Sequence, residues 1–311
     1  ISAVQEMQAL DYDVMIAGGA ESLSRVPYYM PLSTRYSGLR NGNKTLLCSN
    51  EEYAKNTAPP ELYGPIPTMG HTGENVVKLK NISREDQDLF AYQSQMKAKK
   101  AIESGRFAEE IVPVEIASKK GTVIVDKDGH PKPDTTLEAL AKLKPAFAKD
   151  GTITAGNASG MNDAAAAMVI MTEDKAKSMG LKPLAAIGAF AVHALDPRIM
   201  GLAPVGAIQK LLKRTGLRLE DIDLLEINEA FAGQVLGCLK DLGNYIGTPL
   251  YDRLNVNGGA VALGHPLGMS GARLVGTIAM EFQHRPNARY GIASACIGGG
   301  MGLALLLENV H

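Results

Sequence analysis

Residues 290–307 read YGIASACIGGGMGLALLL, two apolar runs that flank three consecutive glycines. This pattern predicts two strands joined by a tight turn, because glycine reaches the positive φ values that such turns need. Cys296 ends the first run, and Gly298 follows it in the turn. A cysteine on a buried strand can be an inert small hydrophobe. Its place beside exposed glycine N–H groups favours chemistry, since a thiol and oxyanion donors then lie together.

The sequence before this hairpin has the pattern of an α/β protein. Residues 184–192 are apolar, residues 205–215 are amphipathic, and residues 223–227 fit a buried strand. Strands that alternate with helices predict a mostly parallel sheet.

The first part of the chain gives two less uniform signals. Residues 13–20 form an apolar run closed by two glycines, which fits a strand buried on both faces. Asn162 can begin a helix over the alanine run at residues 164–167, and residues 169–171 either extend that helix or form a strand. Periodicity does not separate these two possibilities.

Between these parts, residues 27–150 are rich in proline, tyrosine and lysine and contain few buried-strand runs, which indicates an inserted lobe. Within the lobe, Ser83 is a suitable N-cap for a solvated helix that runs toward Ile102 and stops before Gly105.

The composition excludes several classes of protein. Hydrophobic residues make up 45% and charged residues 21% of the 311-residue chain, and the net charge is −1. These values fit a folded globular protein and give no field that would hold a nucleic acid. No apolar run approaches the roughly 20 residues of a membrane span. The three cysteines are far apart, without a C-x-x-C pair, so we expect a reduced compartment, the cytoplasm; a targeting peptide upstream of Ile1 would not be visible.

Two more polar side chains accompany predicted turns or strand ends, where α/β sheets form ligand crevices. Asn228 follows the strand at residues 223–227, and it can simply cap the helix that runs through Gln234 to Asp241. His265 stands between Gly264 and Pro266, where a rigid turn holds either a structural or a catalytic histidine.

Other site chemistries lack their sequence patterns. The chain contains no phosphate-binding G-x-x-x-x-G-K-[ST] loop, and its glycine run at residues 298–300 opens no helix, so the dinucleotide fingerprint also fails. It has neither a G-x-S-x-G elbow nor an H-E-x-x-H zinc motif. Nucleotide hydrolysis, hydride transfer, serine hydrolysis and metal catalysis are therefore unsupported.

Taken together, three segments carry a family resemblance. They are N-E-A-F at residues 228–231, N-G-G-A at 257–260 with G-H-P at 264–266, and C-I-G-G-G at 296–300. In this order and spacing they resemble the thiolase family, whose members include acetyl-CoA acetyltransferases and 3-ketoacyl-CoA thiolases. Further thiolase-like segments lie at residues 17–22, 105–107, 145–147 and 155–160.

The resemblance implies a five-layered α/β fold of two similar βαβαβαββ halves, with an inserted loop lobe and an incomplete first half. We expect the remainder of the N-terminal half at residues 1–30, the CoA-binding lobe at 31–159, the end of the N-terminal half at 160–182, and the C-terminal half at 183–311. An incomplete half would expose an apolar sheet face. The family resemblance also implies a homodimer or homotetramer.

The resemblance assigns four catalytic positions. Cys296 would be the acid/base that moves a proton on the α-carbon of the acetyl thioester. His265 would activate the nucleophilic cysteine and donate to the thioester oxygen, while Asn228 would hold a water of the same oxyanion hole. The N–H of Gly298 would serve a second oxyanion hole.

The same resemblance implies coenzyme A or acyl-CoA as substrate, with no metal and no required cofactor. The matching pantetheine and CoA positions are Met69, Phe147, Ala155, Ser159, Met200 and Phe231. Lys132 would meet the nucleotide end. Two positions depart from the family pattern: Ala139 replaces a common serine, and Thr68 stands where biosynthetic members often carry histidine.

The largest departure concerns the nucleophile. In thiolases it opens a C-x-S-G-[hydrophobic]-x-A segment, whose end matches residues 1–3, so we expect this cysteine upstream of Ile1 and missing from the chain. Cys48, in the lobe, and Cys238, in the middle of a helix, are poor substitutes. As written, the chain would then lack covalent catalysis.

Three functions follow from the resemblance. The first is an acetyl-CoA C-acetyltransferase, an acyltransferase that interconverts acetyl-CoA and acetoacetyl-CoA by Claisen condensation and thiolysis. The second is a degradative 3-ketoacyl-CoA thiolase of fatty-acid β-oxidation. The third is a truncated, non-catalytic protein that binds CoA esters.

Overall fold

The computed structural model describes residues 1–55 and 58–311. Its strands are β1 (Val14–Ser22), β2 (Tyr28–Tyr29), β3 (Leu47–Cys48), β4 (Val114–Ser118), β5 (Gly121–Val125), β6 (Asp163–Met171), β7 (Ala186–Ala194), β8 (Leu224–Ile227), β9 (Tyr290–Ile297) and β10 (Met301–Glu308). Its α-helices are α1 (Ser2–Leu10), α2 (Ser33–Ser37), α3 (Ser49–Lys55), α4 (Pro60–Tyr63), α5 (Met69–Lys80), α6 (Arg84–Glu103), α7 (Leu137–Ala141), α8 (Glu173–Ser178), α9 (Ala203–Thr215), α10 (Ala232–Asp241), α11 (Pro249–Asp252), α12 (Ala260–Leu263) and α13 (Leu267–Phe282). Short 3-10 helices are η1 (Leu23–Arg25), η2 (Arg106–Glu109), η3 (Pro197–Leu202) and η4 (Leu219–Asp221). None of these helices combines the length and apolar content that crossing a membrane requires.

The central sheet has the strand order β7-β10-β9-β8 among the described residues. β9 and β10 form the predicted hairpin, with Cys296 opposite Gly302. β10 also pairs antiparallel with β7, whereas β8 and β9 are parallel. The expectation of a mostly parallel sheet is therefore wrong. Three strands do run in one direction, but the returning hairpin strand β10 is inserted between two of them, so the sheet is mixed.

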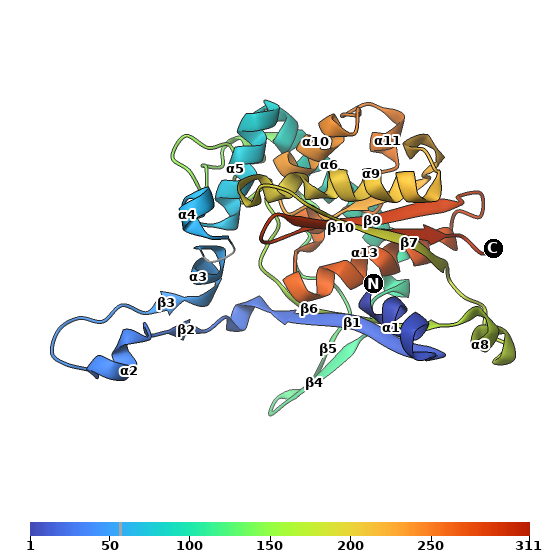
Figure 1. Ribbon diagram of the computed structural model, residues 1–311, viewed down its shortest axis with the longest axis horizontal. Coiled ribbons are helices and arrows are strands. Elements are labelled where there is room, and N and C mark those ends of the chain that lie inside the picture. The colour runs from blue at the N-terminus through green and yellow to red at the C-terminus, as the bar shows by residue number, and fades with distance from the viewer. Residues whose placement is uncertain (56–57) are drawn as a thin grey trace.

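Helices separate this sheet from a second one (Figure 1). α9 packs on one face of the central sheet, against β7, β9 and β10, and α13 packs on the other face. The opposite side of α13 contacts β1 and β6, which pair antiparallel from Val14↔Met171 to Ser22↔Asp163. α1 in turn contacts β1. The molecule is thus a layered α/β structure, as expected.

The pairing of β1 with β6 corrects two expectations. Residues 163–171 form a strand, so the helix suggested by the alanine run is wrong; nine residue pairs with β1 outweigh the helix propensity of alanine. β1 is not buried on both faces, because α13 covers one face and the other is open. Ile16 is 76% and Val169 61% exposed, which is the apolar sheet face expected above.

The largest buried cluster lies between the central sheet and the helices α5, α9 and α10. It includes Val76, Val77, Ile208, Leu211, Ile227, Val235 and Leu236. The amphipathic residues 205–215 accordingly fall within α9, and the expected buried strand is β8, whose four residues are all buried. This core packs against the last residue of β8, Ile227, and the polar residue Asn228 follows it directly.

α6 follows the prediction at both ends and differs in its middle. The Ser83 hydroxyl accepts a hydrogen bond from Asp86 N at 3.0 Å, and Gly105 has φ 79° just beyond the helix. The helix is not a solvated one, because Phe90 and Ala91 are buried where α6 packs against α10 and α12.

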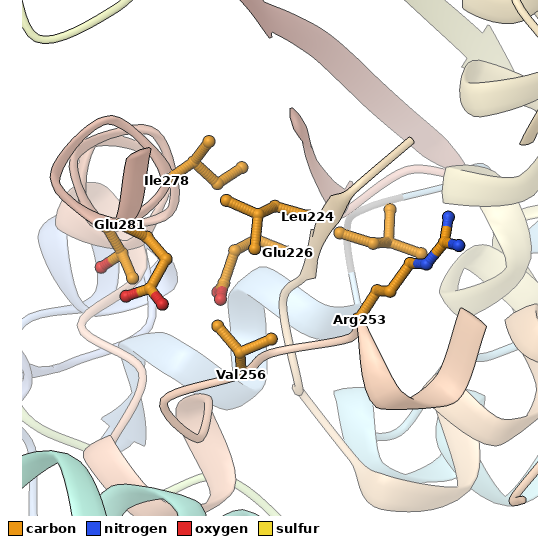
Figure 2. Close-up of a pocket in the computed structure, with 8 residues that line it drawn as sticks. Leu224, Glu226, Arg253, Val256, Ile278 and Glu281 are labelled. Carbon is orange, nitrogen blue, oxygen red and sulfur yellow. The ribbon is translucent and has the colours of Figure 1, made fainter. Parts of the chain in front are cut away.

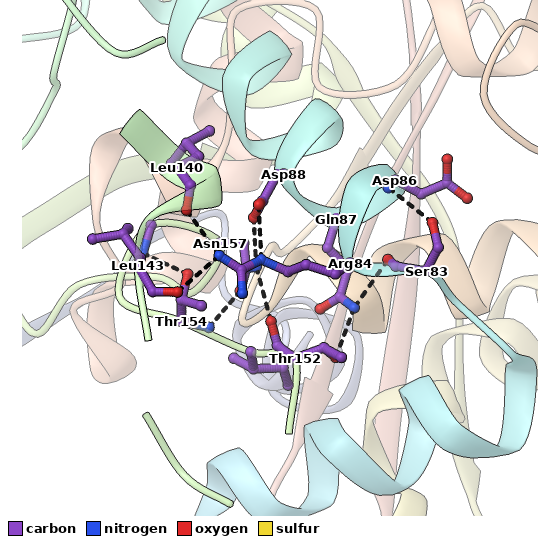
Figure 3. Close-up of polar contacts among 12 residues, drawn as sticks. Ser83, Arg84, Asp86, Gln87, Asp88, Leu140, Leu143, Thr152, Thr154 and Asn157 are labelled. Carbon is purple, nitrogen blue, oxygen red and sulfur yellow. Dashed lines mark hydrogen bonds and ion pairs between the residues drawn. The ribbon is translucent and has the colours of Figure 1, made fainter. Parts of the chain in front are cut away.

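A polar cluster fastens the loop at residues 152–157 to the start of α6 (Figure 3). Arg84 binds Asp88 at 2.7 Å and also donates to the carbonyl oxygens of Leu140 and Leu143. The buried Asn157 amide donates to the other oxygen of Asp88 at 2.9 Å, and its own oxygen accepts from Thr154 N. The loop is therefore held by side chains of the first turns of α6.

β10 approaches α9 so closely at Gly302 that any side chain there would clash with the backbone of α9. A Cβ at this position would lie 2.5 Å from the carbonyl carbon of Ala203, a backbone atom. We expect Gly302→Ala to lower the free energy of unfolding by about 1–3 kcal/mol in denaturant titration. Gly276→Ala is the matched control, because a Cβ there meets nothing within 4 Å and should stabilise α13 by about 0.5–1 kcal/mol. Equal stability of the two variants would show that the approach is not tight.

Candidate active site

Asn228 lies directly beyond β8 and is fully buried. Its backbone N donates to Ser294 O on β9 at 2.9 Å, two residues before Cys296. α10 begins only at Ala232, with Phe231 in the N-cap position, so the interpretation of Asn228 as a helix cap is wrong. The side-chain oxygen of Asn228 has no hydrogen-bond partner in the described part of the chain. A buried amide oxygen of this kind is suited to hold a water or a substrate group.

His265 meets Asn228 across 37 residues of sequence, with Nδ2 of Asn228 3.2 Å from Nε2 of His265. Gly264, at φ 95°, turns the chain into the site, and His265 N is fixed by Gly160 O at 3.1 Å. Burial, reinforced by the positive charge of Arg273, lowers the pKa of His265 to about 4. The imidazole is therefore neutral at pH 7, with one ring nitrogen protonated and the other carrying a lone pair.

The other ring nitrogen of His265 contacts a residue that the sequence analysis missed. Nδ1 lies 2.6 Å from Oγ of Ser270, a buried residue in the first turn of α13. Only its spacing, five residues after the histidine at a helix start, hints at this contact.

Cys296 is the penultimate residue of β9, half-buried and packed against the main core. Burial raises the pKa of its thiol to about 11, so the thiol is protonated at neutral pH. Gly298 follows in the half-buried turn, whose next two residues, Gly299 and Gly300, have positive φ values. A proton donor and a backbone N–H thus occupy the same hairpin end.

The other two cysteines lie in different settings. Cys48 is in β3, which pairs with β2. Cys238 is fully buried in α10, and its Sγ donates to Gly201 O at 3.1 Å. Burial raises the pKa of this thiol far above its usual value. Cys238 is therefore unsuited to act as a nucleophile.

Glu229, the neighbour of Asn228, organises the segments around the site. Its buried carboxylate accepts hydrogen bonds from Asn255 Nδ2 and Ser94 Oγ, each at 2.8 Å, and from Val261 N at 3.0 Å. These donors belong to α6, to α12 and to the segment that follows α11. No motif in the sequence points to Glu229 itself, although a carboxylate inside an apolar stretch needs buried donors.

Four of the residues expected around the pantetheine have contacts near Phe231 or with the main core. The rings of Phe147 and Phe231 meet edge to face at 5.7 Å, and both Met69 and Phe147 pack on the main core. Ser159 N donates to Ala230 O at 3.1 Å, which carries the loop past Phe231. The two aromatic rings thus give an apolar surface, and the backbone of residues 159 and 230 lies next to Phe231 in the chain or through this hydrogen bond.

The remaining expected contacts are more scattered. Met200 is buried on η3, which packs against α5 and α10. Ala155 and Lys132 are exposed, and the backbone N of Lys132 donates to Gln95 at 2.8 Å. Within residues 1–55 and 58–311, no three histidine, cysteine or acidic side chains are grouped to hold a metal ion.

A separate pocket lies between β8 and α13 (Figure 2). The carboxylates of Glu226 and Glu281 point into it, yet it has no room for a water molecule. Each carboxylate already has an arginine: Arg273 is 2.7 Å from Glu226, and Arg106 is 3.0 Å from Glu281. Burial still raises the pKa of Glu226 to about 7. These groups are a buried charge layer and leave no space for a ligand.

Glu229→Gln tests the buried carboxylate. Glutamine has one acceptor oxygen, whereas the carboxylate of Glu229 has two. The amide NH₂ group of glutamine would therefore face at least one of the present donors, which would lose its acceptor. We expect a loss of about 1–3 kcal/mol in the free energy of unfolding, measured by denaturant titration. Glu103→Gln, on the exposed end of α6, should change stability by less than about 0.5 kcal/mol. If both variants matched the parent protein, Glu229 would not hold these segments together.

Two family models match this chain along most of its length. The model described as "Thiolase, N-terminal domain" matches residues 1–174, and "Thiolase, C-terminal domain" matches residues 181–309.

Comparison with individual proteins also finds thiolases that are similar to this chain. An acetyl-CoA acetyltransferase of Syntrophomonas wolfei is 45% identical over 306 residues, which cover 98% of this chain and 75% of that protein. The crystal structure of human mitochondrial 3-ketoacyl-CoA thiolase superimposes with a TM-score of 0.90 at 41% identity, covering 99% of this chain and 75% of that one. The structure of human mitochondrial 3-ketoacyl-CoA thiolase in complex with CoA gives a TM-score of 0.88 at 41% identity, over 100% and 74% of the two chains.

Proposed function

This chain belongs to the thiolase family, an acyltransferase family, and from that premise we propose that it is an acetyl-CoA C-acetyltransferase. The reaction is the Claisen condensation of two acetyl-CoA molecules to acetoacetyl-CoA and free CoA, and its reversal by thiolysis. The observation that carries the proposal is the 3.2 Å contact between Asn228 and His265, beside a buried amide oxygen that has no partner among the residues that the structure describes.

In the proposed mechanism His265 is the base that removes the proton of the acyl-accepting thiol. Its lowered pKa of about 4 keeps the imidazole in the required neutral form. Since Cys48 lies in the lobe and Cys238 is fully buried, the proposal places the acyl-accepting cysteine upstream of Ile1. The proton that leaves this thiol moves to Nε2, and the resulting imidazolium N–H then faces the thioester oxygen together with the water held by Asn228.

Cys296 acts on the α-carbon. In thiolysis, cleavage of the bond between the α- and β-carbons leaves the enolate of acetyl-CoA, and the thiol of Cys296 gives its proton to that carbon. With a pKa near 11 the thiol is ready for this step at neutral pH. In condensation the sulfur must take the same proton back. The N–H of Gly298 faces the negative oxygen, and one such donor typically contributes about 3 kcal/mol to transition-state stability.

Acyl-CoA is the substrate class, and the proposal extends to how it is held. Met69, Phe147 and Phe231, with Met200 beyond, would bound the pantetheine arm with apolar surface. Ser159 would contact its amide groups. The exposed Ala155 and Lys132 would lie along the path toward the nucleotide.

A second candidate, the degradative 3-ketoacyl-CoA thiolase, has one observation in its favour. Thr68 stands where biosynthetic members often carry histidine; it occupies the N-cap position of α5, and its hydroxyl lies 2.9 Å from Nδ1 of His71. For either function we further propose a cytoplasmic homodimer or homotetramer that needs no metal or added cofactor. We also propose that the chain consists of the remainder of the N-terminal half (residues 1–30), the CoA-binding lobe (31–159), the end of the N-terminal half (160–182) and the C-terminal half (183–311).

Thiolysis of acetoacetyl-CoA is the direct test, in a preparation that carries the upstream cysteine. We expect His265→Ala to lower kcat/KM by about 10²–10⁴-fold, because it removes the base. Asn228→Ala should lower it by about 10²–10³-fold, through loss of one oxyanion donor. Glu103→Gln is the control with unchanged rate, and a chelator should have no effect. Retained activity in His265→Ala would overturn the assigned roles.

Chain length separates the two candidates. An acetyl-CoA acetyltransferase should have its highest kcat/KM with acetoacetyl-CoA, with the value falling as the acyl chain of the 3-ketoacyl-CoA lengthens. A rise with chain length would instead support the degradative function.

A further inference from the structure

A chain of hydrogen bonds begins at Asn228 and ends at the turn before α13. Nδ2 of Asn228 lies 3.2 Å from Nε2 of His265, and Nδ1 of the same ring lies 2.6 Å from Oγ of Ser270. The Ser270 hydroxyl donates to Pro266 O at 2.9 Å. Ser270 is 4% exposed, so no bulk water competes for these groups.

The direction of these bonds follows from the number of hydrogens available. A serine hydroxyl has one hydrogen, and a neutral imidazole has one N–H. Because Ser270 gives its hydrogen to Pro266 O, its oxygen receives the N–H of His265 Nδ1. Nε2 then carries the lone pair of the ring, which accepts the N–H of Asn228 in this structure and gives up that hydrogen bond when it takes a proton. The Ser270 hydroxyl, the ring N–H of His265 and one N–H of Asn228 each have an acceptor in this arrangement.

We propose that Ser270 is a positioning residue that holds His265 in the Nδ1–H tautomer and thereby presents Nε2 as the base of the reaction. This inference rests on the proposed function, since it concerns the histidine assigned to that chemistry. Ser270 itself does not touch the substrate in this proposal. It acts through the ring, as the third member of nucleophile, base and orienting group.

The backbone explains why a serine can do this from the next helix. Pro266 has no N–H and a φ of −68°, and α13 starts immediately after it. The first helical turn therefore brings residue 270 back over the imidazole. Gly264 at φ 95° sets the opposite side of the turn. The ring would be free to rotate about its last side-chain bond without an acceptor at Nδ1.

A hydroxyl at Nδ1 also differs from a carboxylate in its charge. A carboxylate would attract a proton to the ring, whereas the charged group that acts on His265 here is Arg273, itself paired with Glu226 at 2.7 Å. Burial and this arginine keep the ring neutral. Ser270 thus orients the base without making it a permanent cation.

The test compares Ser270→Ala and Ser270→Thr, with Thr277→Val as the matched control. Thr277 is a buried hydroxyl on the same helix that bonds to Glu110 at 3.0 Å instead of the histidine. Long-range ¹H–¹⁵N NMR of histidine-labelled protein reports which ring nitrogen bears the proton, and His265→Gln identifies the signal. This readout needs no turnover, so it is independent of the proposed function.

We expect the Nδ1–H tautomer in the parent protein, in Ser270→Thr and in Thr277→Val, and its loss in Ser270→Ala. Thiolysis kcat should fall by about tenfold or more in Ser270→Ala, with KM within about twofold, and recover in Ser270→Thr. An Nε2–H tautomer in the parent protein, or an unchanged tautomer and kcat in Ser270→Ala, would overturn the proposal. The expected tautomer change without thiolysis in any preparation would support the positioning role and reject the proposed function.

Discussion

The buried carboxylate of Glu229 is the constraint on which the site depends. It sits one residue after Asn228 and accepts hydrogen bonds from three segments that are distant in the sequence. A charge in this position is tolerated only when its oxygens are fully partnered. The lobe helix α6 and the start of α12 must therefore close around β8, and the same closure brings His265 to Asn228.

Other buried charges connect the lobe to the C-terminal part of the chain. Arg106 on η2 reaches Glu281 on α13 at 3.0 Å, and Glu281 also accepts from Asn257 at 2.7 Å. On α6, Arg84 holds the carbonyl oxygens of Leu140 and Leu143, and Asp88 holds Asn157. These segments are thus held by polar contacts of fixed geometry as well as by apolar packing. Such contacts give each segment a defined position, which a site assembled from distant segments requires.

Local signals in the sequence predicted the local structure. The glycine turn at residues 298–300, the Ser83 cap and the amphipathic residues of α9 all formed as expected, because each depends on neighbours a few residues away. The errors concern distant partners. The strand β6 exists because β1 pairs with it, and β10 lies between β9 and β7 through a pairing that no local pattern encodes. For the same reason, motif spacing indicated Asn228 and His265, whereas it gave no role to Glu229 or Ser270.

The register of the β8–β9 pair has a consequence for how the chain can vary in length. Asn228 is tied to Ser294, and Cys296 follows two residues later on the same side of β9. One inserted or deleted residue between them would turn the thiol to the other face of the sheet. The β4–β5 hairpin is exposed along both strands, so a length change there alters no buried side chain. Homologous sequences should thus differ in length at the β4–β5 hairpin, while the interval from 294 to 296 stays constant.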